Sequence, residues 1–152
     1  MLYDGIYNSE NYSEISLKEY LDRLADVILL PIYKTKHITV ERHIEDIILP
    51  SKISFSLGII INEILTNIVK HAFKGRDKGN VTISSSKKSA KVLIVIQDDG
   101  VGMPKNITLK TSTGFGLSLI KLMSESINGK IQVKRFNGTS FILEIPINTK
   151  SI

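Results

Sequence analysis

The sequence contains no cysteine and no tryptophan, and only four of its 152 residues are proline. Without cysteine the protein cannot form disulfide bonds, thiolate zinc sites or a cysteine nucleophile. We also find no apolar run that approaches the roughly 20 residues of a membrane-spanning helix. Residues 1–10 lack the basic start and the apolar stretch of a secretory signal. We therefore expect a cytoplasmic protein without direct membrane contact.

Positive charge is in excess, but it is not concentrated. The formal net charge is +5, yet the lysines are scattered rather than gathered into a basic patch with interleaved aromatic side chains. We therefore expect no nucleic-acid partner, and a solvated surface with some bias toward anionic ligands. The hydrophobic and charged contents of 42 % and 23 % are ordinary for a globular protein, and the length is that of one domain.

The stretch ISFSLGIIINEILTNIVKHAFK, residues 53–74, predicts the central helix of the fold. Its apolar side chains recur at steps of three and four residues, at Leu57, Ile61, Ile64, Leu65, Ile68 and Ala72. Glu63, Asn67 and Lys70 follow beside this stripe on successive turns. They suit a magnesium–phosphate site, because an amide oxygen can ligate a hard cation while the phosphates meet a lysine. An ordinary solvated helix edge is the alternative interpretation.

The remaining elements follow from periodicity and turn residues. Ser16 and Glu19 predict a capping box at the start of a helix that Pro31 should end. Predicted strands cover residues 37–44, 81–85, 91–97, 130–136 and 139–147, with turns at Lys87-Lys88-Ser89 and Asn137-Gly138. A second helix should open at Gly114 and end at Asn128-Gly129. The pattern predicts an α+β two-layer sandwich, with helices on one face of a largely antiparallel mixed sheet. Residues 1–35 would form an N-terminal linker helix segment, and residues 36–152 the compact domain.

Two glycine clusters flank the loop at residues 103–113. Asp98-x-Gly100-x-Gly102 follows a buried strand, and Gly114-x-Gly116 precedes a helix. Glycine lets the backbone approach a flat base or a polyphosphate, and the amides at a helix start favour anions. Asp98 can accept a hydrogen bond from the amine of adenine, whereas guanine presents a carbonyl there and should be rejected. A glycine-rich turn on its own more often serves backbone geometry than a ligand, and the glycines match neither a Walker loop nor a dinucleotide fingerprint.

The order of these motifs closely resembles the Bergerat-type ATP-binding fold, which histidine kinases, gyrase B, MutL and anti-sigma-factor kinases share. The resemblance covers residues 53–146 and rests on Glu-x-x-x-Asn, Asp-x-Gly-x-Gly, Gly-x-Gly and a final Gly-Thr. Within the superfamily, NEILTNIVKHAF is most similar to the N box of sensor histidine kinases. The segment EISLKEYLDRLADVI…ITVERHIEDIILP is similar to the stretch that joins the dimerisation helices of one kinase subfamily to its catalytic domain.

The resemblance implies a role for each motif residue. Asn67 would ligate Mg²⁺ on the phosphates of ATP. Glu63 would orient or polarise a reacting water or the acceptor, and Lys70 and His71 would meet phosphate oxygens. Asp98 would take the adenine amine. The other implied nucleotide contacts are Gly100, Gly102, Met103, Gly114, Phe115, Gly116, Leu117 and Thr139, the last through a water molecule. Residues 103–113 would be the ATP lid, which we expect to be mobile without nucleotide because few of its side chains can reach the core.

Two features depart from the family pattern. The predicted lid is short and contains no phenylalanine-rich box. The phenylalanine nearest to it, Phe115, lies between the two glycines of Gly114-x-Gly116. The chain also shows no upstream segment with a phosphoacceptor histidine. His37 and His43 lie on or near a predicted strand and His71 on the central helix, and the three are too dispersed for a metal cluster.

The resemblance therefore implies the ATP-binding catalytic domain of a sensor histidine kinase. Such a domain transfers the γ-phosphoryl group of Mg·ATP to a histidine on a dimerisation segment, and a response regulator then receives the group. Two alternatives stay open. One is a complete serine kinase of the anti-sigma-factor type, against which the helix at residues 16–30 argues mildly. The other is an ATP-gated interaction module without transfer, against which the intact Glu63 and Asn67 weigh.

Overall fold

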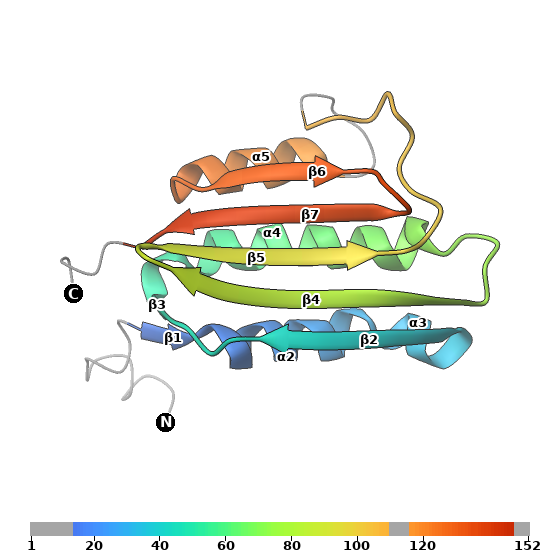
Figure 1. The fold of residues 1–152 in the computed structure, drawn as a ribbon, viewed down its shortest axis with the longest axis horizontal. Helices are drawn as coiled ribbons and strands as arrows, with labels where there is room; N and C mark the ends of the chain where they lie inside the picture. The colour runs from blue at the N-terminus through green and yellow to red at the C-terminus, as the bar shows by residue number, and fades with distance from the viewer. Residues whose placement is uncertain (1–13, 110–115, 148–152) are drawn as a thin grey trace.

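A five-stranded sheet forms one layer of the protein, and helices cover one of its faces (Figure 1). The computed structural model describes residues 14–109 and 116–147. The strand order is β2 (His37–Ile44), β4 (Lys78–Lys88), β5 (Lys91–Asp98), β7 (Thr139–Pro146) and β6 (Lys130–Lys134). Only the β2–β4 pair is parallel; the other three pairs are antiparallel. The predicted two-layer α+β sandwich with a largely antiparallel sheet is confirmed.

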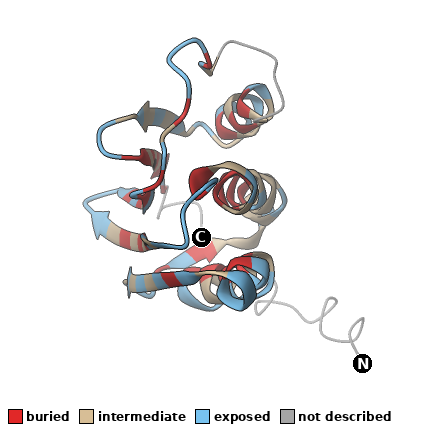
Figure 2. Ribbon diagram, turned by 90° about the vertical axis from the view of Figure 1, so that its right-hand side faces the viewer, coloured by how far each residue is buried: buried red, intermediate tan, exposed pale blue. Residues whose placement is uncertain are grey.

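The core lies between the sheet and three helices, α2 (Leu17–Ile28), α4 (Ser54–Asn67) and α5 (Leu117–Ser126). Figure 2 shows the two layers edge-on, with the buried residues on their facing sides. Alternate residues of β5 and β7 point into the core, as the period of a half-buried strand requires. They are Val92, Ile94 and Ile96 on β5, and Phe141, Leu143 and Ile145 on β7. The core-facing row of β5 ends at Asp98, so a carboxylate terminates an otherwise apolar row.

The central helix matches the predicted position, but it changes geometry near its end. A 3₁₀ turn (Ser51–Ile53) leads into α4, and a π-helical turn (Ile68–Ala72) follows it. Contrary to the sequence-based expectation, Ser51–Ala72 is long and apolar enough to cross a membrane by length and composition. In this fold, however, Leu57, Ile61 and Ile64 are buried against the sheet, and the core helix of a folded domain has the same length and composition.

The N-terminal helix packs into the same core as the rest of the chain. Leu17, Leu21 and Leu29 are almost fully buried, which stabilises the fold by roughly 1.5–3 kcal/mol for each side chain. The Tyr20 hydroxyl donates a hydrogen bond of 2.6 Å to the Ser54 carbonyl at the start of α4. The predicted N-cap is also present, because the Ser16 hydroxyl accepts a 3.2 Å hydrogen bond from the Glu19 amide. Residues 14–35 are therefore anchored to the sheet and to α4.

A second set of contacts fixes α2 against the edge strand β2. Arg42 donates hydrogen bonds to the carboxylates of Asp22 and Asp26, at 2.9 and 2.7 Å. A small two-stranded sheet, β1 (Glu14–Ser16) with β3 (Ile48–Pro50), closes the end of the layer. The sequence did not predict this sheet, since three-residue strands carry no measurable period.

Several predicted boundaries were wrong, each for a local reason. Pro31 does not end a helix: α2 stops at Ile28, and Pro31 lies in the first turn of α3 (Leu30–Thr35), where its missing N–H is not needed. The β4–β5 turn falls at Ser89 and Ala90, because β4 continues to Lys88. At the end of α5, Asn128 rather than Gly129 takes the left-handed conformation, with φ 56°. The amides of these two residues close a Schellman motif on the Glu125 and Ser124 carbonyls.

Candidate functional site

The ends of α4, β5 and β7 meet around a small cavity. It is lined by Asn67, Ile68, His71, Ala72, Asp98, Gly102, Met103, Thr139 and Phe141. Six of the predicted site residues are therefore brought together from four separate segments: Asn67, His71, Asp98, Gly102, Met103 and Thr139. The cavity volume is about 10 Å³, which is room for about one water molecule. A purine can therefore occupy this place only if a wall moves.

Asp98 supplies the buried carboxylate of the cavity. It is the last residue of β5 and only 5 % of its surface is exposed. Burial raises the pKa of this carboxyl group, although hydrogen bonds from the Gly100 and Thr139 backbone amides oppose the shift. The Gly100 amide donates to Oδ1 at 2.8 Å. A buried carboxylate that is held by backbone amides is a rigid acceptor, suited to a ligand N–H group.

Asn67 supplies a buried amide at the C-terminal end of α4. It is 7 % exposed, and its Nδ2 finds no hydrogen-bond partner in the described part of the chain. Such buried polar atoms are rare and expensive in folded proteins, so a ligand that completed this group would gain affinity. The carboxamide oxygen is a ligand type that Mg²⁺ accepts. The described residues contain no group of three or more His, Cys, Asp or Glu side chains that could hold a metal ion. A magnesium ion at Asn67 would therefore depend on phosphate oxygens for its other ligands.

Glu63, one turn before Asn67 on α4, lies next to the start of α5. Gly116 has a φ of 66°, and a Cβ atom built there would lie 2.5 Å from Glu63 Oε2. Within the described residues no side chain caps α5, and the buried Leu117 is its first residue; amides at the start of a helix favour an anion. Lys70 is exposed and lies in the π-helical turn rather than on the regular spiral of Glu63 and Asn67. The predicted contacts at Gly114 and Phe115 lie outside the described residues.

The first glycine cluster serves the protein's own packing as well as the cavity. A Cβ atom at Gly100 would overlap the Ala72 carbonyl oxygen, which accepts a 2.7 Å hydrogen bond from the Val101 amide. Gly100 is therefore required where the loop contacts the end of the central helix. Gly102 has a φ of 79° and lines the cavity itself. The sequence could not distinguish these two requirements, because both are met by glycine.

The loop after Gly102 is anchored more firmly than the sequence predicted. Met103 and Ile107 are buried in the core and Leu109 packs against it, so the expectation that few lid side chains reach the core is wrong for residues 103–109. We call these residues the lid root. Arg135, which the sequence did not single out, donates a hydrogen bond to the Ile107 carbonyl. No local pattern could have indicated a contact between residues 28 positions apart. The predicted remainder of the lid, residues 110–113, lies outside the described part.

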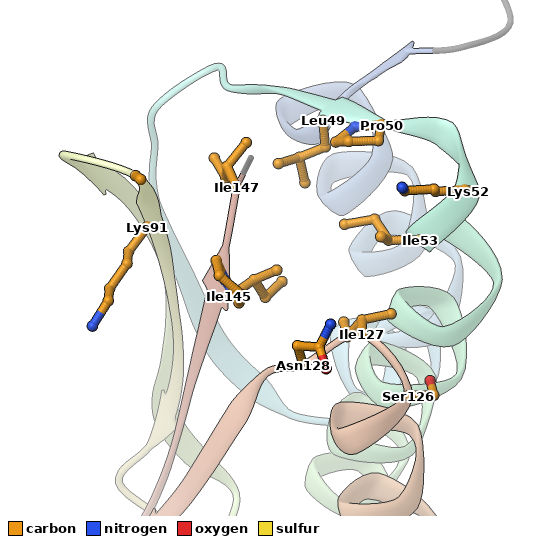
Figure 3. Close-up of a pocket in the computed structure, with 12 residues that line it drawn as sticks. Leu49, Pro50, Lys52, Ile53, Lys91, Ser126, Ile127, Asn128, Ile145 and Ile147 are labelled. Atoms are coloured by element: carbon orange, nitrogen blue, oxygen red, sulfur yellow. The ribbon is translucent and has the colours of Figure 1, made fainter. Parts of the chain in front are cut away.

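A larger pocket, of about 770 Å³, lies away from these residues and contains none of the predicted site residues. Figure 3 shows apolar side chains such as Leu49, Ile53 and Ile145 along its walls, with the Lys91 side chain directed away from it. Among the described residues that line it there is no acidic side chain that could accept a hydrogen bond from an adenine amine. The predicted site residues therefore gather at the small cavity and not at the larger one.

The chain is similar to known proteins over most of its length. Residues 53–149 match the family described as "Histidine kinase-, DNA gyrase B-, and HSP90-like ATPase". The sensor histidine kinase PdtaS of Mycobacterium tuberculosis is 26 % identical over 141 residues, which cover 90 % of this chain and 28 % of that protein. The histidine kinase domain of the Erythrobacter litoralis EL346 blue-light activated histidine kinase superposes with a TM-score of 0.82 at 25 % identity, covering 93 % of this chain and 67 % of that one. A structure of histidine kinase ThkA in complex with the response regulator protein TrrA has a TM-score of 0.72 at 23 % identity, covering 91 % and 42 %, and shares the fold.

Proposed function

Because the chain belongs to the family of histidine kinase-, DNA gyrase B- and HSP90-like ATPases, we propose that it is the ATP-binding catalytic domain of a cytoplasmic sensor histidine kinase. The chain spans about 28 % of the length of the PdtaS kinase it matches. A kinase of this kind has further segments, so the acceptor histidine belongs on a dimerisation segment outside this chain. The observation that carries the proposal is the joint presence of Asp98 and Asn67 on one cavity.

The two ends of the site would hold the two ends of ATP. The Asp98 carboxylate accepts a hydrogen bond from the exocyclic amine of adenine, beside Gly102, Met103 and Thr139. The Asn67 carboxamide oxygen would hold Mg²⁺ together with the phosphates, and the ion would neutralise charge that develops on the transferred group. The first amides of α5 and the exposed Lys70 bind phosphate oxygens. The buried Nδ2 of Asn67, which lacks a protein partner among the described residues, is a donor that a phosphate oxygen could satisfy.

The proposed reaction is transfer of the γ-phosphoryl group. The bond between the γ-phosphorus and the β–γ bridging oxygen breaks, a phosphorus–nitrogen bond forms on the acceptor imidazole, and ADP leaves. The carboxylate of Glu63, on α4, lies next to Gly116 at the start of α5, where it can accept a hydrogen bond from the acceptor's N–H and polarise the attacking nitrogen. Catalysis depends on positioning and charge neutralisation, without a covalent enzyme intermediate. A response regulator would then take the phosphoryl group on an aspartate.

Phosphotransfer from γ-labelled ATP tests this proposal against its alternatives. The purified chain is mixed with Mg·ATP, a dimerisation-helix fragment bearing an acceptor histidine, and a serine-bearing antagonist of the anti-sigma-factor type. We expect an acid-labile, alkali-stable label on the helix fragment, and none with the Asn67→Ala chain. An acid-stable label on the antagonist would identify a serine kinase instead. ATP binding without any label would identify an ATP-gated interaction module.

A further inference from the structure

The tip of the β6–β7 hairpin, residues 135–138, touches the nucleotide site from two sides. On one side Gly138, with φ 114°, lies so close to the strand end that a Cβ atom would overlap the Asp98 carbonyl oxygen. On the other side Arg135 donates its hydrogen bond to the Ile107 carbonyl in the lid root. The hairpin therefore contacts both the floor of the cavity, at Asp98, and the loop that forms its wall.

A short chain of contacts leads from Arg135 to that wall. The carbonyl that Arg135 binds belongs to Ile107, whose own amide donates a 3.0 Å hydrogen bond to the Pro104 carbonyl. The turn closed in this way begins next to Met103, which is 9 % exposed and lines the cavity beside Asp98. Fixing the Ile107 carbonyl thus fixes the backbone from which the Met103 side chain projects.

The surroundings of the Arg135 guanidinium favour a specific role for its hydrogen bond to the Ile107 carbonyl. Its Nε atom is buried without a hydrogen-bond partner among the described residues, which is a cost to the fold. It forms no ion pair within the described part of the chain. An apolar side chain of similar length would fill the same space without this cost. The hydrogen bond to Ile107 is the feature that an apolar side chain would lose.

We infer that Arg135 is a positioning residue for nucleotide binding, which acts through the Ile107 carbonyl to hold the lid root and its Met103 wall in place. The inference rests on the proposed function. The cavity is smaller than a purine, and a change in the Met103 side chain is one way to make room for the base. A methionine can do so by changing rotamers, while the backbone held by Arg135 stays where it is. A backbone that is already ordered need not lose further conformational freedom on binding, so the affinity is higher.

The test compares Arg135→Met and Arg135→Lys with Lys134→Met, a control at the exposed neighbouring position. Calorimetry measures the dissociation constants of Mg·ATP and of adenosine, and hydrogen exchange follows residues 103–109. For Arg135→Met we expect both dissociation constants to rise about tenfold, the loss of one charge-assisted hydrogen bond. The two factors should be equal because Arg135 acts at the base end. Exchange should increase at residues 103–109, and Arg135→Lys should restore part of both effects. Lys134→Met should resemble the parent chain.

Four results would overturn the inference while leaving the proposed function intact. They are unchanged affinity for both ligands, weakened binding of ATP but not of adenosine, tighter binding of both, and loss of exchange protection throughout the fold. Weakened binding of ATP alone would mean that Arg135 meets a phosphate. Tighter binding of both ligands would mean that its contact holds the site closed, and a general loss of exchange protection would mean that its role is merely structural. Absence of adenosine-nucleotide binding by the parent chain would refute the proposed function itself, and this inference with it.

Discussion

Replacing Asp98 by asparagine should separate ligand recognition from folding. The change keeps the shape of the side chain and an oxygen for the hydrogen bond that Gly100 donates at 2.8 Å. It exchanges the other carboxylate oxygen for an NH₂ group, which would face the adenine amine donor to donor. Because the Thr139 amide also hydrogen-bonds the carboxylate, the Tm of the variant must be compared with that of the parent before the affinities are. A hydrogen bond to a charged group contributes roughly 1.5–3 kcal/mol. The dissociation constant for ATP should therefore rise by a factor of roughly 10 to 150.

The same substitution should change how stability depends on pH. Burial raises the pKa of Asp98 in the folded state, with the nearby Asp99 charge adding to the shift and the amides of Gly100 and Thr139 opposing it. A group with a raised folded pKa contributes stability that is fully present below its unfolded pKa, about 3.9. That contribution is lost as the pH rises through the folded value. Asparagine does not titrate, so the Tm difference between variant and parent should move in the variant's favour from pH 4 to pH 8.

Asp99→Asn provides a matched control at the next position. Asp99 accepts hydrogen bonds from the Asn80 backbone and side chain, at 2.7 and 2.9 Å, and does not line the cavity. Calorimetry with ATP and GTP, together with thermal unfolding at each pH, completes the assay. Near-native ATP affinity of the Asp98→Asn chain, or equal affinity of the parent for ATP and GTP, would refute the adenine assignment. A Tm difference that does not change with pH would refute the burial argument.

Three further substitutions test other parts of the structure. Asn67→Ala should make ATP binding independent of Mg²⁺ while the Tm stays close to that of the parent; a retained magnesium effect in calorimetry would remove this residue from the metal site. Leu21→Ala should lower the free energy of unfolding by roughly 2–5 kcal/mol in a single urea transition, whereas exposed Lys18→Ala should change it by less than about 0.5 kcal/mol; a separate early transition would show that α2 unfolds independently. Gly116→Ala should cost about 1–2 kcal/mol for its left-handed backbone and weaken ATP more than adenosine, since its methyl group would meet Glu63; equal weakening of the two ligands would contradict a phosphate role for the start of α5.

The features that follow from local periodicity were predictable from the sequence. The central helix, the apolar strand β5 and the Asn137-Gly138 hairpin all have the predicted positions. Asn137 and Gly138 have φ values of 52° and 114°, and a pair of positive φ angles is what the Asn-Gly sequence predicts for a tight hairpin turn. Asp98 and Asn67 were found because the motif order brought together residues that the fold places on one cavity.

The features that were missed depend on contacts between distant segments. The burial of Met103 and Ile107 is produced by surfaces that no window of sequence contains, and the Arg135 contact joins separate parts of the chain. Pro31 was misjudged because a proline is found in the first turn of a helix as well as after the end of one. The sequence also gave no reason to expect that Gly100 is required by the Ala72 carbonyl as much as by a ligand.

The π-helical turn at Ile68–Ala72 accommodates one more residue than a regular turn would. That extra residue sets the direction in which the Ala72 carbonyl points, and hence the 2.7 Å hydrogen bond to Val101. Deleting one residue within this stretch should restore a regular α-helical turn. The positions of His71 and of the Ala72 carbonyl would then change, and the loop after β5 would lose its hydrogen bond to the helix. Length, as well as residue identity, is therefore constrained between Asn67 and Gly75.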